Sequence, residues 1–172
     1  MTSFRCQTCG EMHSGVPLVW GPDAPDRLRS EVLTPTHRAL LTSDICVIAR
    51  STFFVRACLD LPIVAEASSF FRWLVWVELE RASYRELRSM WRVLRRRAFA
   101  PLAGKLANAL PYEAPTRDLA VELHDRGPGI RPSVLVLDPL HELGREQAAG
   151  ISLEKAYELA GRAMHRQPRP VA

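Results

Sequence analysis

Two cysteines near the start of the chain, in the sequence Cys6-Gln-Thr-Cys9-Gly10, restrict its N-terminal fold more than any other feature. Two thiolates separated by two residues on a tight turn form half of a structural zinc site, and the glycine supplies the positive φ that such a turn usually needs. His13 follows closely enough to be a third ligand. We therefore predict a metal-binding knuckle within residues 1–22.

A tetrahedral zinc ion takes four ligands, so the knuckle needs one more. Cys46, at the start of a predicted strand, is the first candidate, and Cys58 and His37 are weaker ones. The role expected of the zinc ion is structural. Two alternatives stay open: a zinc ion with an open position would be catalytic, with Glu11 as general base, and a metal-free arm would leave the thiols incidental or as a redox pair.

Length and composition favour a single globular domain over residues 1–172, made of the knuckle arm (1–22), a core (44–166) and a frayed tail (167–172). Hydrophobic residues are 47% and charged residues 24% of the chain, which is ordinary globular usage. No apolar run reaches the roughly 20 residues of a membrane span, and the first residues lack an apolar signal core. We therefore expect a cytoplasmic protein, in which four cysteines favour a metal site or buried thiols over disulfides.

The middle of the chain contains apolar runs that are rich in β-branched and aromatic side chains, which indicates strands. The predicted strands are 45–49, 52–59 and 70–79, arranged as an antiparallel meander, and a hairpin pair at 119–124 and 132–137. Helices are predicted at 83–97, 141–149 and 153–165, with an irregular connection at 102–117. The predicted fold is α+β, a mostly antiparallel sheet of about five strands with helices on one face.

The helix predicted at 83–97 begins with a capping box of Ser83 and Glu86. Tyr84, Leu87, Trp91 and Leu94 recur at helical spacing and are expected to face the sheet. Six arginines would share an arc of about a third of a turn beside them; they are Arg81, Arg85, Arg88, Arg92, Arg95 and Arg96. Such a stripe can bind nucleic acid or an acidic protein surface. The interpretation that the sequence favours for the stripe itself is a solvated face whose arginine stems cover the core edge.

A second group of candidates follows the predicted hairpin: His124, Arg126, Arg131 and His141. The hairpin would bring His124 close to Arg131. Imidazole and guanidinium groups together can bind a phosphate or carboxylate, with histidine as acid or base, which would suit an enzyme acting on an anionic small molecule. These residues could equally be turn and surface residues that pair with Glu122 and Asp125.

The order of these motifs resembles domain-of-unknown-function family 2199, an uncharacterised bacterial family, from about residue 4 to residue 165. The matching stretches are Cys6-x-x-Cys9-Gly10-x-x-His13, Ser43-Asp44-Ile-Cys46-Val-Ile48, Phe54-Val-Arg56-x-Cys58-Leu59 with Pro62, Trp73-x-x-Trp76-Val77-x-Leu79, Gly104 to Leu110-Pro111, His124 to Gly129-x-Arg131-Pro132, and His141 to Gln147-x-x-Gly150-Ile151. The resemblance implies a common α+β domain that begins with a Cys-pair knuckle, and it implies no activity.

Taken together, the sequence favours a small zinc-stabilised binding or adaptor protein whose partner is another macromolecule. A protein partner is the first expectation and nucleic acid the second. An enzyme centred on His124, Arg131 and His141, or on an open zinc site, is the main alternative.

Overall fold

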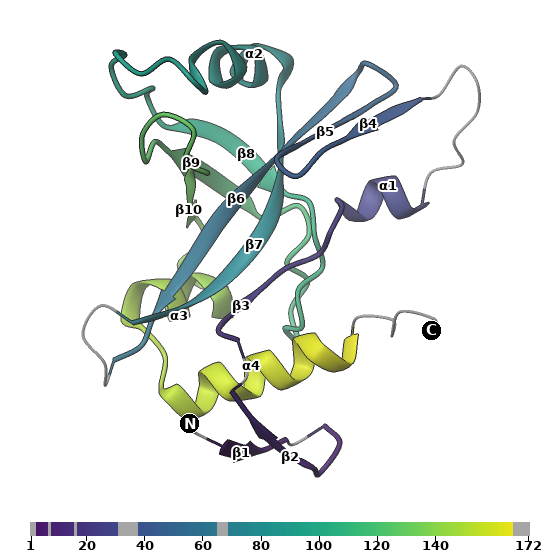
Figure 1. The fold of residues 1–172 in the computed structure, drawn as a ribbon, viewed down its shortest axis with the longest axis vertical. Helices are drawn as coiled ribbons and strands as arrows, with labels where there is room; N and C mark the ends of the chain where they lie inside the picture. The colour runs from purple at the N-terminus through teal and green to yellow at the C-terminus, as the bar shows by residue number, and fades with distance from the viewer. Residues whose placement is uncertain (1–2, 7, 16, 31–37, 65–68, 167–172) are drawn as a thin grey trace.

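The computed structural model describes residues 3–6, 8–15, 17–30, 38–64 and 69–166 of the chain (Figure 1). The strands are β1 Ser3–Arg5, β2 Met12–Ser14, β3 Val19–Trp20, β4 Ala39–Leu41, β5 Ile45–Ile48, β6 Thr52–Pro62, β7 Phe70–Leu79, β8 Leu102–Leu106, β9 Ala120–His124 and β10 Ser133–Val136. The helices are α1 Asp26–Ser30, α2 Arg81–Met90, α3 Glu142–Ala149 and α4 Leu153–Arg166. The predicted tail at 167–172 lies outside the described residues.

Five of the strands close into a barrel, in the order β6-β7-β8-β9-β10 and back to β6. The predicted meander of β5, β6 and β7 and the predicted hairpin of β9 and β10 are both present. The two are joined by a parallel pairing of β10 with β6, at Ser133 and Cys58, which closes the ring. The α+β class is therefore confirmed, but the mostly antiparallel sheet of about five strands is wrong in detail: β5, β4 and β3 extend the sheet, and β3 pairs with β7 in parallel.

The alternation of residues along β6 and β7 separates the inside of the barrel from its outside. Odd-numbered side chains of β6 from Val55 onward and of β7 belong to the main core, where Ala57 pairs with Val75 and Leu59 pairs with Trp73. An even-numbered residue, Trp76, points to the other face. Because side chains alternate with a period of two along a strand, the long hairpin of β6 and β7 contributes residues both to the main core and to the smaller core on the outer face of the barrel.

Helix α2 lies at one end of the barrel, α3 and α4 lie at the other, and α1 lies beside the sheet, so the prediction that the helices lie on one face is wrong (Figure 1). At one end α2 packs Tyr84 against Phe53, with ring centroids 4.8 Å apart. At the other end the chain between α3 and α4 is hydrogen-bonded to the end of β6, where the N–H of Ile151 donates to the Pro62 carbonyl over 2.7 Å. The interior of a barrel is exposed at its two ends, and helices can cover it there. In a sheet that does not close, helices would instead pack on its faces.

The helix α2 is shorter than predicted and begins earlier, at Arg81, so Ser83 is no cap; the capping residue is Glu80, whose side chain makes no capping bond. After Met90 the chain leaves the helix, because the buried Arg96 pairs with Asp125 and the Phe99 ring enters the core. Tyr84, Leu87 and Trp91 do pack on the core, but Leu94 is 84% exposed. Tertiary contacts thus override the helical periodicity beyond Met90.

The connection predicted at 102–117 contains a barrel strand, β8, which the sequence reasoning missed. A Cβ atom at Gly104 would lie 2.6 Å from a methyl carbon of Val77, so only glycine lets β8 approach β7 here. Four short strands, β1, β2, β3 and β4, were also unforeseen. None of the described helices is long and apolar enough to cross a membrane.

Candidate metal centre

The N-terminal hairpin of β1 and β2 carries the knuckle. Phe4 pairs with His13 across the two strands. In the turn between them, the Gly10 N–H donates to the Cys6 carbonyl and the Cys6 N–H to the Glu11 carbonyl, both over 2.8 Å. Gly10 has a φ of 75°, the left-handed conformation predicted for it. The short, tightly hydrogen-bonded turn holds the two cysteines and His13 on one side of the hairpin.

Four side chains converge beside this turn and define the four-donor cluster: Cys6, Cys9, His13 and His165. Their ligand atoms all lie within 4.8 Å of one another. The Cys6 sulfur is 3.4 Å from Nε2 of His165, and the Cys9 sulfur is 3.2 Å from Nε2 of His13. Sulfur and nitrogen ligands of a tetrahedral zinc ion lie about 3.3–3.8 Å apart, so the cluster can hold a metal ion with small adjustments.

The Cys6 sulfur lies where a thiolate is favoured. Burial opposes ionisation, but hydrogen bonds from the backbone N–H groups of Cys9 and Thr8 and from the side chains of Cys9 and His165 lower the pKa of Cys6 to about 6. Cys6 is 1% exposed, whereas Cys9 is open to solvent. Thiolates are the form in which cysteines bind metals, so this environment suits a ligand.

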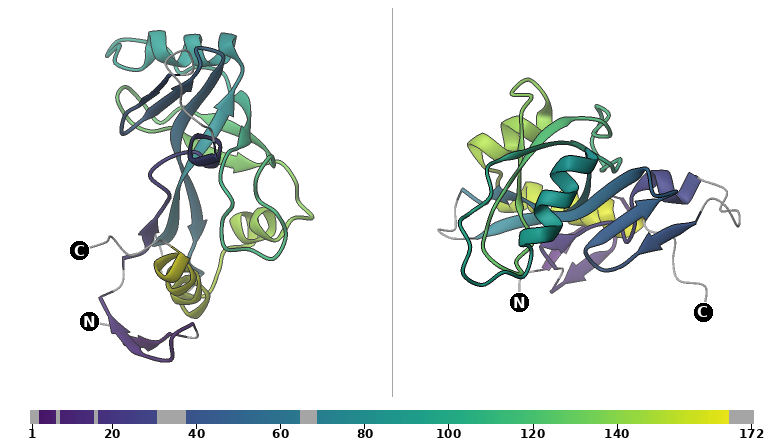
Figure 2. Two further views of the ribbon diagram at one scale, coloured as in Figure 1. Left: turned by 90° about the vertical axis from the view of Figure 1, so that its right-hand side faces the viewer. Right: turned by 90° about the horizontal axis from the view of Figure 1, so that it is seen from above.

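The fourth donor, His165, comes from α4, on whose outer face the hairpin lies (Figures 1 and 2). Tyr157, Gly161 and His165 are spaced four residues apart and so form one stripe of the helix. The Tyr157 ring stacks on Phe4 with centroids 4.8 Å apart. A Cβ at Gly161 would lie 3.1 Å from the Cys6 sulfur. The missing side chain at Gly161 therefore lets the helix approach the cysteine.

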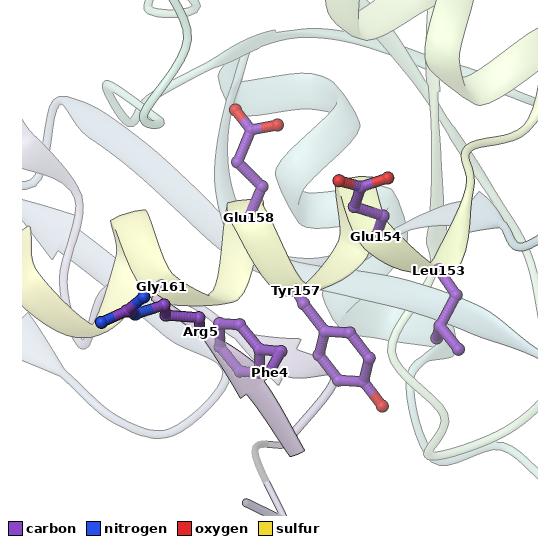
Figure 3. Close-up of a pocket in the computed structure, with 7 residues that line it drawn as sticks. All are labelled: Phe4, Arg5, Leu153, Glu154, Tyr157, Glu158 and Gly161. Atoms are coloured by element: carbon purple, nitrogen blue, oxygen red, sulfur yellow. The ribbon is translucent and has the colours of Figure 1, made fainter. Parts of the chain in front are cut away.

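An open pocket of about 430 Å³ flanks this contact (Figure 3). The rings of Phe4 and Tyr157 lie side by side along one edge of α4, and Glu154 and Glu158 project from the other side of the helix. Glu158 is already paired with Arg162 over 2.5 Å. The pocket thus lies along the edge of the contact between the hairpin and α4.

Cys46, predicted as the fourth ligand, does not lie in the four-donor cluster. Its side chain is fully buried between the sheet and the segment around α1, in a small outer core with Ile48, Phe54 and Trp76. Burial raises the pKa of its thiol to about 11, as expected for a cysteine in apolar surroundings. Cys58 is buried in β6, and His37 lies outside the described residues.

Sequence reasoning missed His165 because its contact with Cys6 spans 159 residues. Two signals could have pointed to it. Gly161 and His165 share one stripe of the predicted helix, and a glycine inside a helix often marks a place where another segment packs closely. In the described part of the chain, no other group of histidine, cysteine and acidic side chains is close enough to hold a metal ion.

The residues of the predicted anion site have separate partners. His124 contacts Glu122 over 3.4 Å on the same strand. Arg131 donates to Asp44 over 2.7 Å, and His141 caps α3 by accepting from the Leu143 N–H. Arg126 is exposed. His124 is adjacent to the start of β10, as predicted. The four side chains of the predicted anion site are nevertheless not gathered around one ligand position.

The six arginines of the predicted stripe are divided by the early end of α2. Arg81, Arg85 and Arg88 lie in the helix, and Arg92 and Arg95 lie in the segment after it. Arg96 is 7% exposed at its side chain and forms a two-pronged ion pair with Asp125. Its role is structural, so it leaves the candidate binding surface.

The fold and the four-donor cluster define an α+β barrel protein with a Cys/His cluster that could hold a metal ion between its N-terminal hairpin and its last helix. The chain belongs to the family described as "Uncharacterized protein conserved in bacteria (DUF2199)", which matches residues 5–151. No curated protein and no solved structure matches the chain. The matched stretch contains Cys6, Cys9 and His13 and ends before His165.

Replacing Gly161 with alanine should have opposite effects on metal binding and on the helix. The new methyl group would crowd the Cys6 sulfur, so we expect zinc affinity to fall several-fold. The metal-free protein should gain up to about 1 kcal/mol, because alanine is the better helix former. Competition with a chromophoric chelator and thermal unfolding of the metal-free form measure the two effects. Unchanged affinity would mean that Cys6 moves freely and that the close approach is unimportant.

Proposed function

We propose that this protein binds another macromolecule, with a structural zinc ion in the four-donor cluster fastening its N-terminal hairpin to α4. The convergence of two thiols and two imidazoles from these two parts of the chain carries the zinc part of the proposal. Two sulfur and two nitrogen donors are a typical zinc set, and four protein ligands leave no open position for a water molecule. A closed site of this kind supports folding and not catalysis.

Weak packing of the hairpin supports a structural role for the metal. Cys6 is the only buried side chain among those described in residues 4–15. Two strands of three residues each are too short to be stable on their own in water. The ring contact of Phe4 with Tyr157 and a metal ion would together hold the hairpin in place.

The alternative of an enzyme has less support. The carboxylate of Glu11, the base considered for a catalytic zinc ion, is exposed on the hairpin, and it would act only if a ligand position were open. His124, Arg131 and His141 are engaged with different partners. A binding protein is therefore the function that the arrangement favours.

Zinc titration of the His165→Ala variant tests this proposal. The wild-type protein, purified without tags or chelators, should contain about one zinc ion per chain, as four-ligand sites do. Loss of His165 should lower zinc affinity at least about tenfold, because a three-ligand site replaces a closed one. His124→Ala, which removes a histidine outside the cluster, is the control and should bind zinc normally. A wild-type protein that takes up no zinc would contradict the proposal, as would an unchanged affinity in His165→Ala.

A further inference from the structure

A groove of about 640 Å³ lies between the turn joining β4 to β5 and the C-terminal end of α2. The groove is lined on one side by the hydroxyl groups of Thr42 and Ser43, and on the other by Arg88 and Arg92. It is at the end of the barrel opposite the four-donor cluster (Figure 1). Its chemistry is therefore independent of the metal centre.

The arginines beside this groove carry uncompensated charge. Arg85, Arg88, Arg92 and Arg95 are exposed, and no described side chain forms an ion pair with them. The one acidic residue that lines the groove, Asp44, already accepts hydrogen bonds from Arg131 and from Ser43. The groove therefore has a positive field and unused donors.

These arginines are not needed to terminate α2. The Met90 carbonyl accepts from the Val93 N–H, and the Trp91 carbonyl accepts from the Gly129 N–H. Two carbonyls at the helix end are thus satisfied by backbone groups, which leaves the guanidinium groups of Arg88 and Arg92 without a capping role at these two carbonyls.

Apolar side chains adjoin the charged ones. Val93 lines the groove, Leu94 is 84% exposed, and Ile130 is 49% exposed on the turn that contacts Trp91. Trp91 also lines the groove, but it packs in part on the core, so only part of its ring is open for base stacking. A phosphodiester backbone would gain little from exposed leucine and isoleucine, whereas a peptide with acidic and apolar residues complements both kinds of side chain.

We propose that this groove binds a segment of a partner protein in which acidic residues meet Arg88 and Arg92 and apolar residues cover Val93 and Leu94. The inference rests on the proposed function as a binding protein and names the chemistry of the partner. It does not rest on the metal ion, because the groove and the four-donor cluster lie at opposite ends of the barrel.

The test uses a fluorescein-labelled peptide in which pairs of glutamate alternate with leucine, followed by fluorescence anisotropy. The full-length protein should bind it saturably at low salt, and Arg88→Glu/Arg92→Glu should lower the affinity at least about tenfold through charge reversal. Arg29→Glu/Arg117→Glu, which alters exposed arginines outside the groove by the same net charge, should have a much smaller effect. Leu94→Ser should weaken binding at both low and high salt, because its contribution is apolar.

Three results would overturn the proposal. They are absence of saturable binding at millimolar peptide, equal losses in the two charge-reversed variants, and tighter binding of a labelled oligothymidylate that is insensitive to Leu94→Ser. The third would favour nucleic acid. Cys6→Ser should bind the peptide as the wild type does, so a failure of this proposal is distinguishable from a failure of the zinc proposal. Circular dichroism of each variant checks that the barrel is folded.

Discussion

Replacing Cys6 with serine is expected to remove zinc from the protein and to release the hairpin while the barrel stays folded. Cys6 is the one buried donor of the cluster, and it contacts both the knuckle turn and His165. At free zinc about a thousandfold above the Kd, a site that exists only in the folded state adds about 4 kcal/mol of apparent stability, and the variant should lose it. Zinc content by mass spectrometry and chemical unfolding with and without zinc measure the two effects.

Cys46→Ser is the informative control, because Cys46 is the ligand that the sequence favoured and the structure places in the outer core. It should lower stability through the buried hydroxyl while binding zinc at full stoichiometry. Hydrogen exchange should show the amides of residues 8–15 opening in Cys6→Ser but not in Cys46→Ser. Loss of zinc in Cys46→Ser and retention in Cys6→Ser would contradict the assignment of the cluster.

Replacing Asn108 with leucine should destabilise the protein by about 3 kcal/mol, since two or more buried polar groups would lose their partners. The Asn108 side chain is fully buried; it accepts from the Trp76 N–H over 2.8 Å and donates to the Ala24 carbonyl over 3.1 Å. It occupies the gap along β7 between the residues paired with β3 and those paired with β8. For a chain of this size the Tm should fall by about 6–12 °C.

A double-mutant cycle with Asp26→Ala checks the mechanism of this loss. Asn108 also donates to Asp26, and the same carboxylate accepts from the Ala109 N–H. The cost of Asn108→Leu should be smaller when Asp26 is already absent, because the two side chains share one hydrogen-bond network. Additive effects would mean that Asn108 acts through packing and not through this network, which joins the segment before α1 to the barrel.

The sequence predicted several local features well, although the capping box of Ser83 and Glu86 was wrong. The predicted bounds of the strand at 70–79 agree with β7, since ten residues of apolar and aromatic character leave little choice. The last helix, predicted at 153–165, agrees closely with α4, and Ser152 just before it caps the helix by accepting from the Lys155 N–H. By contrast, β8 was missed because Leu102–Leu106 is short and follows a proline, and only pairing with β7 and β9 makes it a strand.

The candidate site likewise combines residues that local spacing predicts with residues that only the tertiary structure brings together. Cys6, Cys9 and His13 lie within eight residues, so a single turn brings them together, and the motif alone was enough to predict that they are neighbours. The contact of His165 with Cys6 depends on the packing of α4 against the hairpin. The ion pair of Arg96 with Asp125, which removes Arg96 from the exposed arginine stripe, likewise depends on the tertiary structure. Sequence spacing specifies which groups a turn, strand or helix can present, because those geometries repeat over a few residues. Barrel closure and the fourth metal donor depend on packing between segments far apart in the chain, and that packing is decided by the whole core.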